Sequence, residues 1–134
     1  MTNTIVSIVD DEIDITELFR DALRRSIADI SVVSFNDPLL ALEHFTANKE
    51  RYSLVISDLK MPKISGIELL RKIKKSNPSV RTILMTAFEL DELQQKELSK
   101  KVVDKLLQKP IKLHNLFTEA INQLQSYELM VLTK

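Results

Sequence analysis

The sequence predicts an α/β fold, a doubly wound sandwich in which a parallel sheet of five strands has helices on both faces. Short apolar runs rich in β-branched residues alternate along the chain with stretches whose apolar residues recur every three or four positions. The runs are typical of strands buried on both faces, and the stretches are typical of amphipathic helices. Because one helix separates each pair of successive strands, the strands should be parallel, and right-handed crossovers then place helices on both faces.

Five strands are predicted, each an apolar run that ends at a polar residue or a proline. They cover residues 4–9, 30–35, 52–57, 79–87 and 104–110. The third run leads directly into Asp58. Pro110 ends the fifth run, because proline lacks the N–H group that a sheet requires.

Five helices are predicted between and after these strands. The first three begin near side chains that can cap a helix, namely Asp14, Asp37 and Ser65. The fourth lies within residues 88–101, where the helical period is poor, so we expect a weakly docked helix and a candidate partner surface. The last helix carries the clearest apolar stripe, over residues 113–131.

The composition is that of a single globular domain. The chain has 134 residues, of which 44% are hydrophobic and 28% charged, with a net charge of zero and no cysteine. The zero net charge gives no electrostatic reason to expect direct nucleic-acid binding, and no apolar run approaches the roughly 20 residues of a membrane-spanning helix. We therefore expect a cytoplasmic protein that contacts neither nucleic acid nor membrane.

Polar residues that can carry chemistry stand at the carboxyl ends of the predicted strands. They are Asp10, Asp11, Asp58, Thr86 and Lys109. Any one of them could be a turn residue or a helix cap. However, Asp10 and Asp11 are not needed as caps while Asp14 is nearby, and ligands of doubly wound sheets bind outside the carboxyl ends of the strands. The set therefore predicts one functional edge.

The three carboxylates at this edge predict a site for a hard cation. Clustered carboxylates repel one another unless a cation neutralises them. Magnesium fits better than calcium, because it is held by one or two carboxylates and keeps waters that phosphate oxygens can replace. A carboxylate beside Mg²⁺ can attack phosphorus and form an aspartyl phosphate. Lys109 could then pair with one phosphate oxygen, and Thr86 could donate a hydrogen bond to another.

These residues resemble the receiver domain of two-component response regulators, in particular a stand-alone receiver of the chemotaxis-regulator type. The matching motifs are "VDDE", "ISDLKMPKISG", "LMTA" and "QKP", and the resemblance covers residues 4 to about 125. It implies a flavodoxin-like (βα)5 sandwich with strand order 2-1-3-4-5. It also implies a receiver domain over residues 1–125, with residues 126–134 as an extension of the last helix or the start of a linker.

The resemblance implies a metal site and a phosphorylation site that share one aspartate. Asp58 corresponds to the phosphoacceptor. Asp11 and Asp58 correspond to direct Mg²⁺ ligands, Asp10 to a ligand acting through water, and the backbone carbonyl of Lys60 to a further ligand.

Other residues correspond to positions that sense the phosphoryl group, or lie around it, in receiver domains. Thr86 and Lys109 correspond to the phosphate-sensing pair, Ala87 keeps the entrance to the site open, and the bond before Pro110 is expected to be cis. Pro62 and Gly66 correspond to turn residues of the loop after Asp58, and Gly66 is the only glycine in the chain.

The sequence departs from the family pattern at positions that bear on switching. Leu106 stands where an aromatic residue commonly follows the movement of the threonine, which puts that readout in doubt. Val102 and Val103 replace the usual glycine and alanine before the fifth strand. Lys60 and Phe88 flank the expected phosphoryl group, where a long cation and an aromatic ring could hinder water and prolong the phosphorylated state.

The leading interpretation is a phosphorylatable switch that is not an enzyme for an external substrate, although it catalyses its own phosphorylation and dephosphorylation. A histidine kinase or histidine phosphotransfer protein would phosphorylate Asp58. The face of the fourth helix, fifth strand and fifth helix would then contact a downstream protein effector or a second copy of the chain.

One alternative is a phosphorylation-independent interaction or dimerisation module. Another is a small phosphatase with Asp58 as nucleophile, which Lys60 disfavours because that chemistry usually needs an acid two residues after the nucleophile.

Overall fold

The computed structural model describes residues 3–87, 91–92, 95–96 and 101–133. The strands are β1 (Thr4–Val9), β2 (Ile30–Phe35), β3 (Tyr52–Asp58), β4 (Arg81–Thr86) and β5 (Lys105–Gln108). The helices are α1 (Ile13–Ser26), α2 (Pro38–Asn48), α3 (Gly66–Ser76) and α5 (Leu113–Leu132), with a 3-10 turn at Lys49–Arg51. No helix within these described ranges is both long enough and apolar enough to cross a membrane.

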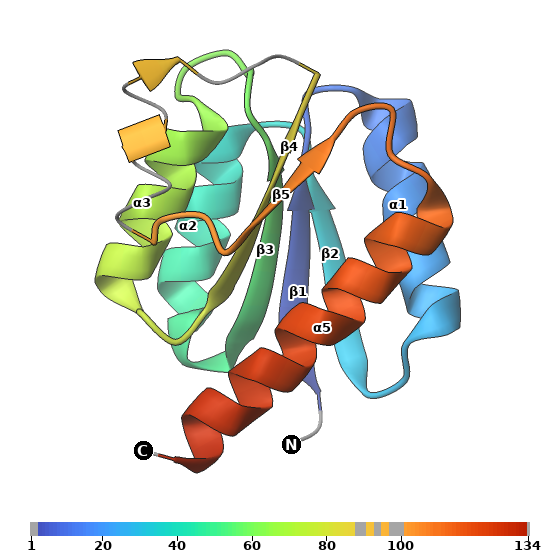
Figure 1. The fold of residues 1–134 in the computed structure, drawn as a ribbon, viewed down its shortest axis with the longest axis vertical. Helices are drawn as coiled ribbons and strands as arrows, with labels where there is room; N and C mark the ends of the chain where they lie inside the picture. The colour runs from blue at the N-terminus through green and yellow to red at the C-terminus, as the bar shows by residue number, and fades with distance from the viewer. Residues whose placement is uncertain (1–2, 88–90, 93–94, 97–100, 134) are drawn as a thin grey trace.

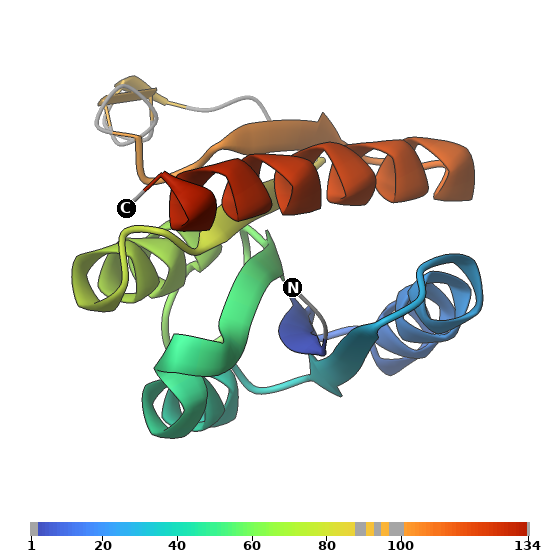
Figure 2. The same cartoon turned by 90° about the horizontal axis from the view of Figure 1, so that it is seen from below.

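The five strands form one parallel sheet in the order β2-β1-β3-β4-β5 (Figure 1). Helices α1 and α5 cover one face, and α2 and α3 cover the other (Figure 2). This is the predicted flavodoxin-like sandwich with the predicted strand order. The expectation of a helix within residues 88–101 falls largely outside the described residues, although the Gln95 N–H donates to the Asp91 carbonyl at 2.9 Å, as it would in a helix.

The sheet is buried on both faces, as the apolar runs predict. Every residue of β1 and β3 is buried, whereas the edge strands β2 and β5 are mostly half-buried or exposed. Successive side chains of a strand point to opposite faces, so one strand contributes to two cores. In β3, Val55 packs toward α2 and α3, while Leu54 and Ile56 pack toward α1 and α5. Packing on both sides gives the strand ends fixed positions.

Two of the three predicted helix caps are confirmed, and the third is wrong. The Asp37 carboxylate accepts a hydrogen bond from Leu39 N–H at 2.9 Å, and the Ser65 hydroxyl accepts one from Glu68 N–H at 3.2 Å. Asp14 is not a cap, because α1 begins one residue earlier and Asp14 lies in its first turn. There its carboxylate interacts favourably with the positive end of the helix dipole.

The last two strands are shorter than predicted, since β4 covers Arg81–Thr86 and β5 covers Lys105–Gln108. Ser79 N–H bonds to the Asn77 side chain in the turn before β4, at 3.2 Å. Before β5, the left-handed backbone conformation falls on Lys101, with φ of 61°, rather than on Val102 or Val103, which are both buried. The turn therefore forms without the usual glycine.

A half-buried ionic network anchors the start of β5. The Asp104 carboxylate accepts hydrogen bonds from the Thr82 N–H at 2.9 Å and from the Thr82 hydroxyl at 3.2 Å. It also pairs with the Lys74 ammonium at 2.7 Å and with the Arg81 guanidinium at 3.5 Å. Burial lowers the pKa of Lys74, and the bond to Asp104 acts in the opposite direction. Asp104 thus joins α3, β4 and β5.

We predict that Asp104→Ala destabilises the fold by about 3 kcal/mol, because removing one partner leaves the Lys74 charge poorly solvated. Urea unfolding at pH 7 measures the change. The matched control is Asp21→Ala, which removes an exposed carboxylate that lies 3.2 Å from Arg20 and should cost less than about 1 kcal/mol. Equal losses in the two variants would show that the network does not stabilise the turn.

Candidate functional site

The predicted polar residues meet at the carboxyl edge of the sheet. Asp10 follows β1, Asp58 is the last residue of β3, Thr86 is the last residue of β4, and Lys109 follows β5. The cavity there has a volume of about 380 Å³, and its lining residues are Asp11, Glu12, Asp58, Lys60, Thr86, Ala87 and Lys109. Parallel strands place all of these ends on one side, which is why residues far apart in the sequence converge.

Three carboxylates lie close together in this edge. Oxygen atoms of Asp10, Asp11 and Asp58 all lie within 4.8 Å of one another. Asp10 is fully buried, Asp58 is 7% exposed, and Asp11 is exposed. Oxygen donors of this kind are those that a hard divalent cation prefers, so the donor set fits Mg²⁺.

Placing the charged carboxylates of Asp10 and Asp58 in this partly buried edge lowers the stability of the fold. Burial raises the pKa of Asp10, and the nearby Asp58 charge raises it further. Burial likewise raises the pKa of Asp58, with a further contribution from Asp11. Because both pKa values are higher in the folded than in the unfolded chain, the metal-free fold loses stability as the pH rises through them. A bound cation would relieve this cost.

Lys109 partly compensates the negative charge. Its ammonium lies 3.2 Å from Asp10 Oδ2 and 3.1 Å from Asp58 Oδ1. Burial lowers the pKa of Lys109, but the two carboxylates more than offset that effect, so the pKa is raised overall. Lys109 therefore stays charged at neutral pH, between the two buried acids.

The backbone around Lys109 couples it to β4. Its N–H donates to the Thr86 carbonyl at 2.8 Å, and the Lys109–Pro110 peptide bond is cis. The ammonium and the Thr86 side chain, which is 1% exposed, thus come from directly bonded backbone segments. A movement of the backbone at Thr86 would therefore displace the backbone at Lys109, and the reverse.

The Asp10 carboxylate makes one local contact and one contact with a residue far away in the chain. Its Oδ1 accepts a hydrogen bond from Glu12 N–H at 3.0 Å, and its Oδ2 faces Lys109. Its backbone carbonyl accepts a bond from the Asn36 amide at 2.9 Å, and that amide also donates to the Thr16 hydroxyl at 2.9 Å. Asn36 was missed in the sequence, although it directly follows β2 at the same edge.

Gly66 is required for space rather than for an unusual backbone conformation. A Cβ atom at this position would lie 2.1 Å from the Asp58 carbonyl oxygen. Gly66 N–H donates to the Leu59 carbonyl at 2.8 Å, which fixes the start of α3 against the residue that follows β3. The left-handed conformation in this loop belongs to Lys63, next to Pro62, with φ of 76°. The close approach of Gly66 holds the backbone of Asp58 in place.

The remaining predicted residues divide between the site and its surroundings. Ala87 and Lys60 line the cavity. Leu106 is half-buried and packs against the core on the side of α2 and α3. Phe88 lies outside the described residues.

Comparison with known proteins gives consistent matches along most of the chain. A family model described as the response regulator receiver domain matches residues 6–121. Sporulation initiation phosphotransferase F of Bacillus subtilis is 37% identical over 100 residues, which are 73% of this chain and 77% of that protein. The transcriptional regulatory protein CpxR homolog of Haemophilus influenzae is 36% identical over 104 residues, 77% of this chain. Those residues are 42% of the regulator, so the chain spans less than half of its length.

A solved structure extends the likeness to the fold. The response regulator protein TrrA from Thermotoga maritima, in complex with Mg²⁺-BeF, superimposes with a TM-score of 0.73 and is 29% identical. The match covers 90% of this chain and 98% of that chain. The fold and the sequence thus point to the same group of proteins.

Proposed function

This chain belongs to the family of response regulator receiver domains, and on that basis we propose that it is a signalling switch phosphorylated on Asp58 with Mg²⁺ bound. The observation that carries the proposal is the Lys109 ammonium, 3.1 Å from Asp58 Oδ1, beside carboxylate oxygens that lie within 4.8 Å of one another. This arrangement offers a nucleophile, a cation for the phosphate oxygens and a set of metal ligands. The domain covers residues 1–125 in this proposal, and residues 126–134 extend the last helix.

The four proposed metal contacts are unequal. Asp11 is exposed and Asp58 borders the cavity, so both can offer an oxygen directly, together with the backbone carbonyl of Lys60. Asp10 already has a partner on each oxygen, Glu12 N–H and Lys109, so we assign it to a contact through water. When bound, Mg²⁺ supplies positive charge that neutralises the carboxylates and the incoming phosphate oxygens.

The chain's own residues then perform the transfer. An oxygen of Asp58 bonds to phosphorus while the bond from phosphorus to a histidine nitrogen of the donor breaks. The Lys109 ammonium pairs with one phosphate oxygen, and the Thr86 hydroxyl donates a hydrogen bond to another. The donor is a histidine kinase or a histidine phosphotransfer protein. The Bacillus subtilis relative is named as a phosphotransferase, which suits a role in passing a phosphoryl group between proteins.

The conformational response to phosphorylation follows from the coupling of Thr86 and Lys109. Because the Lys109 N–H bonds to the Thr86 carbonyl, a pull on either side chain is transmitted to the end of β4 and the segment after β5. We expect the response on the side of β5 and α5, where a downstream protein effector or a second copy of the chain would bind in the cytoplasm. Phosphorylation shifts the populations of two conformations rather than creating a new fold.

The direct test of this function is a single phosphoryl adduct on Asp58. We expect the wild-type protein to gain the mass of one phosphoryl group when it is incubated with Mg²⁺ and acetyl phosphate, and Asp58→Asn to gain none. Intact-mass spectrometry measures both. A protein that binds Mg²⁺ but gains no adduct would instead be an interaction module, and continuous release of phosphate from a phosphate monoester would indicate a phosphatase.

The unequal metal contacts give a second prediction. Asp10→Ala should slow adduct formation by about 10- to 100-fold, as is usual for a group that acts on a metal through an intermediate partner. Asp11→Ala should slow it more, because a direct ligand is lost. Rates measured at a fixed Mg²⁺ concentration decide the order, and a larger loss in Asp10→Ala would reverse the assignment of the two residues.

A further inference from the structure

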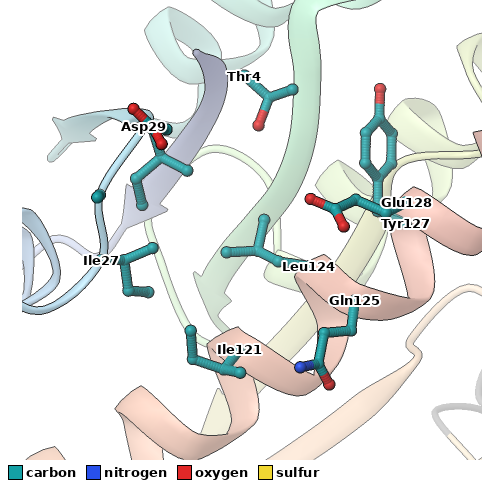
Figure 3. A pocket seen from close by; sticks show the side chains of 10 residues that line it. Thr4, Ile27, Asp29, Ile121, Leu124, Gln125, Tyr127 and Glu128 are labelled. Carbon is teal, nitrogen blue, oxygen red and sulfur yellow. The ribbon is translucent and has the colours of Figure 1, made fainter. Parts of the chain in front are cut away.

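A second pocket lies at the opposite end of the sheet from Asp58. It has a volume of about 300 Å³ and is bounded by the start of β1, the loop between α1 and β2, and the second half of α5 (Figure 3). Thr4, the first residue of β1, lines it, whereas Asp10 follows the last residue of that strand. The strand rises about 3.3 Å per residue, so its six residues separate the two sites by roughly 20 Å.

Aliphatic side chains from three segments form the wall of the pocket. They are Ile27 from the α1–β2 loop, Ile30 at the start of β2, and Ile121 and Leu124 from α5. All four are half-buried, so each keeps apolar surface in contact with solvent. Covering that surface with a ligand would release water from it, which favours binding of an aliphatic body.

The rim of the pocket is acidic. Asp29 and Glu128 are exposed and lie on either side of the aliphatic wall, with the Glu128 side chain turned toward the α1–β2 loop (Figure 3). Among the described residues that line the pocket, none is basic. The local potential therefore favours a cation.

Hydrogen bonds hold the loop that carries Asp29 in position. Asn3 N–H donates to the Asp29 carbonyl at 2.6 Å, and the Ser31 hydroxyl donates to the Asn3 side chain at 2.9 Å. Asp29 itself adopts a left-handed conformation with φ of 63°. An ordered loop loses little further backbone entropy when a ligand binds beside it.

We propose that this pocket binds a small aliphatic ligand that carries a cationic group, of the chemical class of the primary alkylammonium ions. The hydrocarbon chain lies on the wall of Ile27, Ile121 and Leu124, and the ammonium group lies between Asp29 and Glu128. A volume of about 300 Å³ is at the lower end of ligand pockets, which limits the ligand to a short chain. This site is independent of the phosphorylation of Asp58.

The test is an NMR titration of the ¹⁵N-labelled protein with hexylammonium, hexanol and hexanoate, each at physiological salt so that weak long-range attraction is screened. We expect hexylammonium to shift the amide signals of residues 27–30 and 121–128 and to saturate them. Hexanol should bind more weakly and hexanoate most weakly. Hexanol binding as tightly as hexylammonium would overturn the role of the carboxylates. No saturable shift, or shifts confined to residues near Asp10, Asp11 and Asp58, would overturn the site itself.

Charge-neutral variants test the rim directly. Glu128→Gln and Asp29→Asn should each weaken hexylammonium binding by about two- to fivefold, as expected for exposed ion pairs. Asparagine tolerates the left-handed conformation of position 29, so that variant keeps the loop. The matched control is Glu43→Gln on the exposed face of α2, which should leave binding unchanged. Equal affinity in all three variants would show that the rim charges do not recognise the ligand.

Discussion

Repulsion among the carboxylates of Asp10, Asp11 and Asp58 is the constraint on which the rest of the structure depends. Strands β1 and β3 are neighbours in a parallel sheet, so the acids that follow or end them are brought within 4.8 Å of one another. Two of these acids are buried, and burial raises the pKa of both. Lys109 offsets part of the charge, and a bound divalent cation would offset the rest. The site is therefore held ready for a cation and an anionic phosphoryl group.

The scaffold tolerates this strain because the strand ends are fixed on every side. The strands β1 and β3 are buried throughout, and Gly66 lets α3 approach the backbone of Asp58 so closely that a Cβ atom would not fit. Asn36 holds the backbone of Asp10 from the next strand. At the far end of β4, Asp104 bonds to Thr82 and anchors the start of β5, the strand that leads to Lys109. These contacts keep like charges together although they repel.

The sequence predicts the fold, and it predicts which polar residues meet at one edge of the sheet, because local patterns of residues determine both. Apolar runs mark the strands, and a polar residue directly after a run marks the functional edge. Asp14 was wrongly predicted as a cap, since nothing local distinguishes a cap from a first-turn acid. Asn36 and Asp104 were missed because their partners lie 26 and 22 residues away in the chain. Lys63 and Lys101 take left-handed conformations that their residue type does not favour, so only the tertiary structure reveals them.

The folded chain holds its carboxylates together at a cost in stability, and a divalent cation should remove that cost. The free energy of unfolding with and without Mg²⁺ measures this most directly. At pH 7 and a Mg²⁺ concentration 100 times the dissociation constant, one site stabilises the fold by about 2.7 kcal/mol. Sodium chloride at the same ionic strength should not reproduce this gain. The gain should shrink as the pH falls through the raised pKa values of Asp10 and Asp58, where protonation already removes the repulsion. Equal free energies of unfolding in Mg²⁺ and in sodium chloride of the same ionic strength would show that no divalent cation relieves the repulsion among the carboxylates.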